Sequence, residues 1–571
     1  MEPLSEGRKC SYCGAHYFAE EMTKRTKKYM ACCDNGMLKI PFIKPPEELI
    51  HHLFTGNSSK AKLFQKNIRK YNTALAFASV SSKIVEFKTA GPPTVVVQGN
   101  IQHKLGSLNK PADKVAAYMQ CYFYEEGGKD NAYFECTANE ESLLRELRTW
   151  IKANNRIFGQ LQHNIDLLKT SIGTESSYNI VFMDKVSAMP RTYNSPLCPE
   201  VSLITSSDLE SSQHNYKRSI IVPVQYNGRL QEVPYWSPFF YPLCYPLFHL
   251  YGEAGWHINL TTTKGSKVTI NDHSKYILQV RDPIFRANTD AKPTKMIQDI
   301  LLCGNGLTQQ YMCDLYLAVE NNNLQYLRAH QNELKAELYC DLLEAKYKNE
   351  YPLAGRYVVL PHTHVGSPRW YYGEYQDGMA RCRKFHKPDL FITFTCNPNW
   401  PEIVQSMKGF EAGSYFRPDL IARCFQIRLQ ILLEDLESNC IFGDVLGYMY
   451  SVEWQKRGLP HAHILIFLTK ECRFRNTADV DRVIRAEIPN PITHRDLWEL
   501  VTTNMIHGPC GIIIQKNKTK ETTNLPHCCL NGTCEEHFPK ELRSETFITQ
   551  DSYPEYRRRS KKDGGHTFYD K

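Results

Sequence analysis

The amino-acid sequence predicts an α+β protein, and three features of its 571 residues support this prediction. Between Asp389 and Leu468, short apolar runs typical of strands alternate with segments whose apolar residues have helical spacing. Helical patterns also occupy residues 47–76 and 138–169. Cysteines cluster near both ends of the chain, where small metal-binding modules are expected. The chain is too long for one hydrophobic core, so several domains are expected.

The region before residue 291 mixes helical and strand patterns, so we expect an α/β arrangement after an N-terminal cysteine-rich module. Residues 194–216 are rich in serine, proline and asparagine and lack a period, which predicts a loop or linker. An aromatic cluster ending at Trp256 accompanies the strand pattern that follows this loop. The strands expected from apolar runs are Val95–Val97, Met119–Tyr124 and Ile220–Val224.

The second half of the chain begins with helical patterns at residues 296–350, which we expect to be interrupted by Asn321–Asn323. A proline- and cysteine-rich region follows Leu468. The predicted parts are a zinc-binding module (1–45), an α/β region (46–193), a linker (194–216), an aromatic-rich β region (217–290), a sheet-and-helix core (291–470) and a Cys/His-rich basic region (471–571).

Composition limits the possible functions. The formal net charge of +8 weakly favours a polyanionic partner. No apolar run reaches the roughly 18 residues that span a bilayer, and the first residues lack an apolar signal core. We therefore expect an intracellular protein with no membrane partner. The sequence has no G-x-x-x-x-G-K-[ST] motif, so it gives no sign of a P-loop ATPase.

Residues 556–562 carry five cations in seven positions. One interpretation is a solvated or disordered tail. The other is a segment that contacts phosphate or directs nuclear import, with Arg557, Arg558 and Arg559 as DNA contacts. We expect a nuclear protein on the second interpretation.

The strongest local motif lies between Glu453 and Leu468. His461 and His463 begin an apolar strand, and the period of two places both imidazoles on one face. Gly458 and Pro460 predict a tight connection to the preceding strand, which would bring Glu453 or Gln455 beside them. Two imidazoles and one oxygen suit Mn²⁺ or Mg²⁺ with positions open for a phosphate. The alternatives are a zinc site and two partly buried histidines without a metal.

A second polar segment runs from Lys387 to Glu402. Its strand pattern places Thr393 and Thr395 on one face with Phe391, opposite the apolar side chains. The threonine hydroxyls and Asn397 can contact a DNA backbone or support a metal ligand. The alternative is that threonine stands here only because it favours strands.

The cysteines near the N-terminus have metal-ligand spacing. Cys10 and Cys13 form a C-x₂-C pair, and Cys32 with Cys33 can complete a tetrahedral zinc site. Adjacent cysteine ligands are unusual, so His16 is the reserve fourth ligand. The alternative is a disordered leader with reduced surface thiols.

A second cluster near the C-terminus has irregular spacing. We expect a zinc knuckle that uses Cys510, Cys534 and one or two further ligands, and the alternative is a loop with core cysteines. The members of this cluster are His507, Cys510, His527, Cys528, Cys529, Cys534 and His537.

The segments Pro388–Ile403 and Gln455–His463 closely resemble the helicase-like, replication-initiator region of eukaryotic Helitron transposases. The resemblance continues in order along nearly the whole chain. Its further signatures are Cys32–Gly36, Ile68–Asn72, Tyr245–Phe248 with Gly252, Gly255 and Trp256, Gly366–Arg369, Tyr375–Met379, Ala486–Pro489, Met505–Gly511, Cys534, Phe538–Lys540 and Tyr553–Arg559.

The resemblance implies an HUH endonuclease-like core, in which a central antiparallel sheet carries packed helices. In that family a tyrosine attacks a phosphate of single-stranded DNA and forms a 5′-phosphotyrosine link during rolling-circle transposition. His461 and His463 would bind Mg²⁺ or Mn²⁺ with Glu453 or Gln455. Lys456 and Arg457 join the threonines as expected DNA contacts.

The sequence departs from the family pattern in two respects. The nucleophilic tyrosines of the family lie four apart on a helix, and we expect this pair beyond Lys571. Tyr553 and Tyr556 are three apart and separated by Pro554, so no catalytic tyrosine is assigned. The sequence also shows no sign of the helicase domain that usually follows in this family, and enzymatic activity stays open. The alternatives are a non-catalytic DNA-binding remnant and a metal hydrolase that activates water.

Overall fold

The computed structural model divides the chain into two compact units. The first contains Met1–Gln376, Thr393–Gln430 and Val452–Ala462, and the second contains Asp377–Ile392, Ile431–Ser451 and His463–Lys571. The structure describes residue 4, residues 8–77 except 24–27, 42, 44 and 45, and residues 79–81, 102–104, 137–159, 178–182, 201–206, 219–222, 231–281, 299–334, 360–407, 416–455, 458–507, 529–530, 533–534, 537–538, 540–548 and 554–568.

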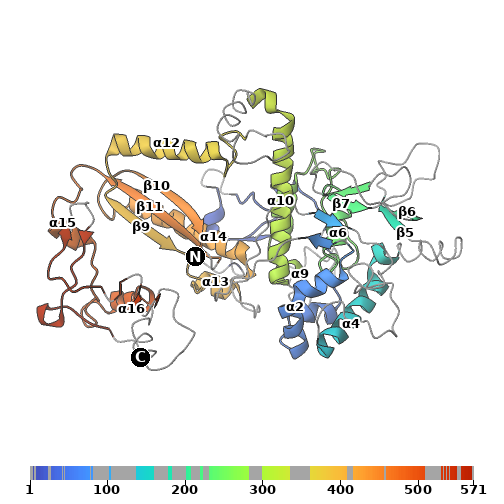
Figure 1. Ribbon diagram of the computed structural model, residues 1–571, viewed down its shortest axis with the longest axis horizontal. Helices are drawn as coiled ribbons and strands as arrows, with labels where there is room; N and C mark the ends of the chain where they lie inside the picture. The colour runs from blue at the N-terminus through green and yellow to red at the C-terminus, as the bar shows by residue number, and fades with distance from the viewer. Residues whose placement is uncertain are drawn as a thin grey trace. The chain divides into compact units, whose positions relative to one another are not determined.

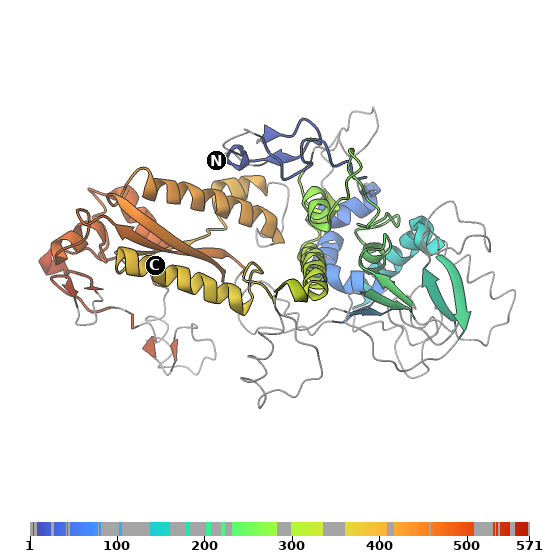
Figure 2. The same cartoon turned by 90° about the horizontal axis from the view of Figure 1, so that it is seen from above.

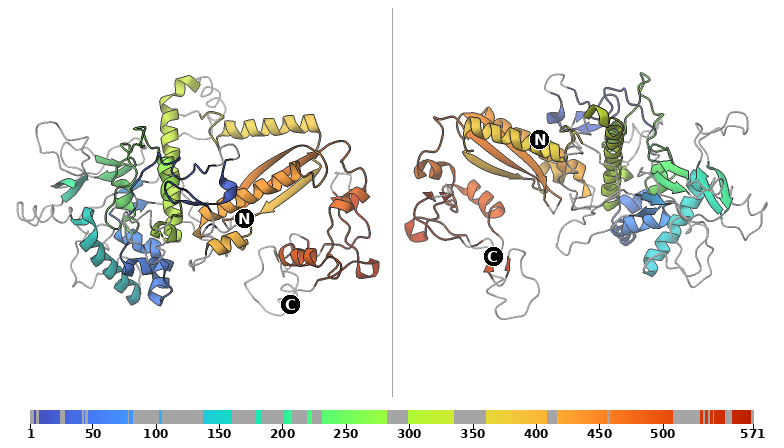
Figure 3. Two further views of the ribbon diagram at one scale, coloured as in Figure 1. Left: turned by 180° about the vertical axis from the view of Figure 1, so that it is seen from behind. Right: turned by 45° about the horizontal axis from the view of Figure 1, so that its top comes forward.

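An aromatic core dominates the helical part of the first unit. Its largest fully buried side chains include Tyr71, Tyr241, Tyr245, Phe248 and Tyr311. Figure 1 shows α2 and α9 beside the long α10, and both views of Figure 3 place α2 next to α4. The helices of this part are α1 (Glu48–Thr55), α2 (Ser59–Leu75), α4 (Ala138–Asn154), α6 (Phe240–Cys244), α7 (Ile270–Ile277), α9 (Ile300–Cys303) and α10 (Gly306–Ala329).

The helices expected at 47–76 and in the first half of 138–169 are confirmed. The expected interruption at Asn321–Asn323 is wrong, because α10 continues through all three asparagines. Asparagine costs a helix only about 0.7 kcal/mol per residue or less. Buried side chains such as Leu307 and Leu315 anchor the helix, and the Asn322 side chain accepts a hydrogen bond from the hydroxyl of Tyr235 at 3.3 Å.

Beyond the short strand pair near the N-terminus, the described residues of the first unit form two further small sheets. One has the strand order β3-β4-β7-β8, and the other pairs β5 with β6 antiparallel. The expected strand at Ile220 is confirmed. The loop expected at 194–216 is wrong for Val201–Ser206, because its apolar β-formers pair with Tyr178–Phe182. The runs at 95–97 and 119–124 lie outside the described residues. The strands are β3 (Ser79–Ser81), β4 (Gln102–Lys104), β5 (Tyr178–Phe182), β6 (Val201–Ser206), β7 (Ser219–Val222) and β8 (Gln231–Pro234).

A three-stranded antiparallel sheet carries the histidine motif. It contains β9 (Leu390–Thr395), β10 (Val445–Trp454) and β11 (Pro460–Leu468) in the order β10-β11-β9, and each strand has residues in both units. Three helices accompany it, α12 (Pro368–Phe385), α13 (Pro401–Ser406) and α14 (Pro418–Glu437). Figure 2 shows α12 and α14 along opposite faces of the sheet. The expected alternation of strands and helices between 389 and 468 is confirmed.

Short elements frame the two ends of the chain. The N-terminal cysteines lie around β1 (Arg8–Lys9), β2 (His16–Tyr17) and η1 (Ala19–Glu21). The second unit ends in α15 (Thr477–Val483), α16 (Arg495–Asn504), β12 (Cys529–Leu530), β13 (Thr533–Cys534), β14 (Phe547–Ile548), β15 (Pro554–Glu555) and η6 (Lys561–Asp563), while η4 (Gln331–Leu334) follows α10. Among the described helices, none combines the length and apolar character needed to cross a bilayer.

Candidate metal centres

The β10–β11 hairpin positions the two histidines. Along β11 the side chains alternate between buried and half-buried, so His461 and His463 share one face. The buried side chains Ala462, Ile464 and Ile466 occupy the other face. The turn is closed by a hydrogen bond from the Gln455 amide to the Leu459 carbonyl at 2.9 Å, and Gly458 has a φ of +75°. Glycine adopts this left-handed conformation without the strain of a Cβ, so the sequence favours this turn.

The hairpin brings three possible ligands together. Glu453, His461 and His463 each offer a ligand atom, and these atoms all lie within 4.8 Å of one another. Glu453 is exposed and the histidines are half-buried, so a bound ion would remain accessible to a substrate. Mixed nitrogen and oxygen ligands suit Mn²⁺, Mg²⁺ or Zn²⁺. The assignment of these residues as ligands stays a prediction.

Gln455 contacts a histidine through its side chain. Its amide Nε2 lies 2.8 Å from Nδ1 of His461. The two ends of an amide are assigned from the hydrogen-bond network, and in the opposite orientation Oε1 would accept a hydrogen bond from the Nδ1–H group. That orientation leaves the Nε2 lone pair of His461 available for a metal. In that arrangement Gln455 would orient His461 and Glu453 would stand beside both histidines, and the choice between Glu453 and Gln455 as third ligand stays a prediction.

The neighbouring strand β9 presents the predicted polar face. Thr393 and Thr395 are exposed on the same side as Phe391, whose ring stacks on His463 with centroids 5.3 Å apart. Phe391 was not predicted as a site residue, although the strand alternation placed it on this face. Asn397 accepts a hydrogen bond from the Asn399 amide at 2.9 Å, which shapes the turn before α13. Lys456 and Arg457 lie outside the described residues.

Four buried cysteines form the second candidate centre. The sulfurs of Cys10, Cys13, Cys32 and Cys33 lie within 4.8 Å of one another. Cys33 Sγ is 3.6 Å from Cys10 Sγ and 3.9 Å from Cys32 Sγ. Zinc bound at about 2.3 Å by four sulfurs separates them by about 3.8 Å, so the spacing fits a tetrahedral ion. This cluster can bind a metal ion such as zinc.

The backbone around the cysteines also suits a metal. Asp34, Asn35 and Gly36 have φ values of 46°, 52° and 83°, and this turn lets the Gly36 amide donate to Cys33 Sγ at 3.2 Å. Hydrogen bonds from the Cys32 and Cys33 thiols lower the pKa of Cys13. The cluster therefore stabilises a thiolate, which is the form that binds zinc.

The reserve ligand His16 lies outside the four-cysteine cluster. It is buried, and its Nδ1 donates to the Leu4 carbonyl at 3.1 Å. The burial of all four cysteines also contradicts the alternative of surface thiols in a leader. The cysteines share a hydrophobic core with Val268 and Tyr276, so the centre is packed into the first unit.

The C-terminal cluster is described only in part. Cys534 is buried, and its Sγ lies 3.4 Å from Nε2 of His507. The His507 ring stacks on Phe538 with centroids 4.1 Å apart. Cys510 lies outside the described residues, as do His527 and Cys528, so the zinc knuckle stays a prediction.

The three C-terminal arginines are held by acceptors in their own unit. Arg557 forms ion pairs with Asp481 and Glu487, and Arg558 donates to the Ala486 carbonyl at 3.2 Å. Arg559 makes two side-chain hydrogen bonds to Glu487. These contacts contradict the interpretation of a solvated tail at these positions. Phosphate binding by the arginines stays a prediction, and it would compete with the contacts.

The fold defines a mixed helix-and-sheet protein, and its described residues contain two candidate metal centres, one of cysteines and one of histidines with a carboxylate. Residues 294–466 match the family model described as the Helitron helicase-like domain at the N-terminus. The chain is therefore Helitron-related over these residues, which include Glu453, His461 and His463, and the resemblance is confirmed within this range. No curated protein matches the chain.

Proposed function

We propose that the Helitron-like domain binds single-stranded DNA and cuts it with a divalent metal ion in an HUH-type core. The observation that carries the proposal is the grouping of Glu453, His461 and His463 on one sheet face inside the matched region. The two histidines and the carboxylate fit Mn²⁺ or Mg²⁺ and leave coordination positions for phosphate oxygens. A nuclear location follows from this proposal, because the DNA of a eukaryotic element would be the substrate.

The residues around the ion have separate roles in this proposal. A bound Mn²⁺ or Mg²⁺ would polarise the scissile phosphate. Gln455 orients His461, and Phe391 packs against the ring of His463. The hydroxyls of Thr393 and Thr395 lie on an exposed strand face, from which they can donate to DNA phosphate or sugar oxygens. No side chain is assigned as the nucleophile.

The test uses the full chain with Mn²⁺ and single-stranded oligonucleotides labelled at the 3′ end. We expect metal-dependent cleavage, and His463→Ala should abolish it. The control is His494→Ala, which alters an exposed histidine outside the proposed metal site and should retain cleavage. Label that migrates with the protein on a denaturing gel indicates a covalent link to the chain. Released product without this link indicates that water is the nucleophile.

Two outcomes would contradict cleavage. DNA binding that requires His463 but yields no product would leave a non-catalytic DNA-binding protein. Wild-type protein that binds neither Mn²⁺ nor single-stranded DNA would refute the proposed site itself. Metal binding is measured separately by calorimetry, so each failure is assigned to binding or to cleavage.

A further inference from the structure

We propose that the four-cysteine centre is a structural part of the Helitron-like domain, and that Arg423 is the positioning residue that couples this centre to the sheet carrying the histidine motif. The coupling between zinc and α14 is argued from contacts within the first unit. The expected effect on Mn²⁺ binding at the histidine site rests on the proposed function above.

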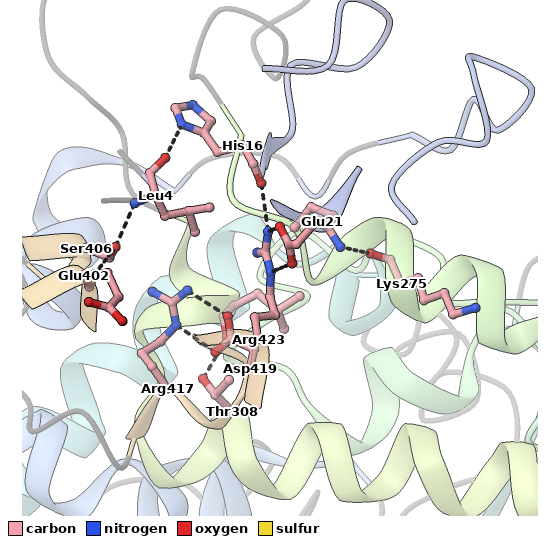
Figure 4. A network of polar contacts seen from close by, with 12 residues as sticks. Leu4, His16, Glu21, Lys275, Thr308, Glu402, Ser406, Arg417, Asp419 and Arg423 are labelled. Carbon is pink, nitrogen blue, oxygen red and sulfur yellow. Dashed lines mark hydrogen bonds and ion pairs between the residues drawn. The ribbon is translucent and has the colours of Figure 1, made fainter. Parts of the chain in front are cut away.

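Arg423 on α14 is the centre of the contact. Its Nε and one terminal nitrogen donate to the two carboxylate oxygens of Glu21, each at 2.6 Å. The same terminal nitrogen donates to the His16 carbonyl at 3.2 Å, and the guanidinium lies 5.4 Å from the ring centroid of Phe18. The side chains of Arg423 and Glu21 are only 17% and 14% exposed. Figure 4 shows this network.

The cysteine turn sets the position of these acceptors. The Cys10 amide donates to the Ala15 carbonyl at 2.9 Å, and the Gly14 amide donates to the Cys10 carbonyl at 2.8 Å. His16 follows this turn directly and supplies the carbonyl that Arg423 binds. An ion that fixes Cys10 and Cys13 would therefore fix the backbone that receives the guanidinium.

One further hydrogen bond joins the N-terminal segment to the helices, and a buried ion pair fixes the start of α14. The Leu4 amide donates to Ser406 Oγ on α13 at 2.8 Å. Before α14, Arg417 binds both carboxylate oxygens of Asp419 at 2.9 and 2.8 Å, and the Arg417 side chain is 3% exposed. Removing one partner of such a buried pair destabilises the fold strongly, because the remaining charge is left uncompensated.

The opposite side of α14 packs against the apolar face of β9, behind the face that carries Thr393 and Thr395. The ring of Phe425 stacks on Phe394 of β9 with centroids 5.5 Å apart, and Phe394 stacks on Trp400 at 5.9 Å. Strand β9 carries Thr393 and Thr395 and pairs with β11. Arg423 and Phe425 thus connect the cysteine turn to the strand beside the histidine motif through one rigid helix.

This arrangement differs from an independent DNA-binding zinc finger. A finger on a flexible linker would leave the rest of the domain unchanged when its zinc is removed. Here the buried contacts make the order of α14 depend on the cysteine centre. Coupling between two sites is reciprocal, so loss of the Arg423 contacts must also weaken zinc binding.

The test compares Arg423→Met with Arg482→Met in the full chain, because Arg482 is 72% exposed. The zinc affinity is measured by equilibrium competition with a chromogenic chelator, together with amide hydrogen exchange of residues 418–430. We expect Arg423→Met to weaken zinc binding about tenfold, within the usual range of coupling. Arg423→Lys, which keeps the charge, should retain part of the wild-type zinc binding. Arg482→Met should match the wild type in both measurements.

The second arm removes the zinc from the other side. The single variant Cys32→Ser should show faster amide exchange in residues 418–430 than the wild type. Adding Cys32→Ser to Arg423→Met should increase this exchange little further. Unchanged exchange in Cys32→Ser, wild-type zinc affinity in Arg423→Met, or a purified chain that never binds zinc would each overturn the proposal. Should Arg423→Met fail to fold, exchange in chelator-treated wild-type protein decides the question.

Mn²⁺ affinity is then measured in the same variants. We expect Arg423→Met to weaken Mn²⁺ binding several-fold if the proposed function holds. The wild-type protein could show amide exchange in residues 418–430 that depends on zinc and yet bind no Mn²⁺. That result would refute the proposed function and leave the coupling of zinc to α14 supported.

Discussion

Arg559 holds Glu487 across 72 residues of sequence. Its Nε donates to one carboxylate oxygen at 2.8 Å, a terminal nitrogen donates to the other at 2.7 Å, and its backbone amide donates at 3.1 Å. Both residues belong to segments that resemble Helitron signatures. The contact gives these two segments a shared structural role within the second unit.

The first prediction concerns acid stability. The hydrogen bonds from Arg559 lower the pKa of Glu487 from 4.5 to about 2. A lowered carboxyl pKa stabilises the fold above the unfolded pKa, and this contribution is lost as the pH falls from about 4.5 to about 2. We expect residues 554–560 to lose amide protection across this window. Glu487→Gln should remove most of that pH dependence, whereas Glu499→Gln, at a carboxylate that is 55% exposed, should retain it. Identical acid profiles for Glu487→Gln and the wild type would contradict the assignment.

The second prediction concerns the orientation of His461. Gln455→Ala removes the side chain that lies 2.8 Å from Nδ1, so the imidazole loses its fixed orientation. Removing a partner that orients a metal ligand commonly weakens metal binding by about 10–100-fold. We expect about a tenfold loss of Mn²⁺ affinity by calorimetry. Gln405→Ala, at an exposed position on α13, is the control. Equal affinity in Gln455→Ala and the wild type would show that the contact does not support binding.

Local patterns predicted the histidine hairpin and the cysteine centre. His461 and His463 are two residues apart, so the strand period alone places them on one face. Cys10, Cys13 and Cys32 also lie within a short stretch, where few arrangements can bring the sulfurs together. In both cases the spacing in sequence limits the spacing in space.

Distant contacts could not be predicted in this way. Glu21 and Arg423 are 402 residues apart, and neither has a neighbouring motif that identifies its partner. The continuation of α10 through Asn321–Asn323 likewise depends on side chains packed elsewhere in the fold. Tertiary packing outweighed a weak local preference there, and no single-sequence pattern records that packing.

The third prediction concerns metal content. Cys13→Ser removes one of the four sulfurs that lie within 4.8 Å of one another, and a buried hydroxyl is a poor replacement for a thiolate ligand. We expect the zinc content to fall by about one ion per chain and the melting temperature to fall with it. Cys313→Ser, at an exposed cysteine, should change neither quantity. Unchanged zinc content in Cys13→Ser would contradict the assignment of the centre, whatever metal the C-terminal cluster holds.

The fourth prediction separates DNA contact from metal binding. Thr393→Val and Thr395→Val remove a hydroxyl while keeping a β-branched side chain that suits a strand. Hydrogen bonds to charged groups contribute about 1.5–3 kcal/mol, so each change should weaken binding of single-stranded DNA at least tenfold if its hydroxyl contacts a phosphate. Mn²⁺ affinity should stay at the wild-type value, because neither threonine belongs to the Glu453, His461 and His463 group.

Thr503→Val, at an exposed position on α16, is the control for both measurements. Fluorescence anisotropy with a labelled oligonucleotide measures the DNA affinity. Wild-type DNA affinity in both variants would mean that this face of β9 does not contact the DNA, and loss of Mn²⁺ affinity alongside DNA affinity would instead assign the threonines to support of the metal ligands.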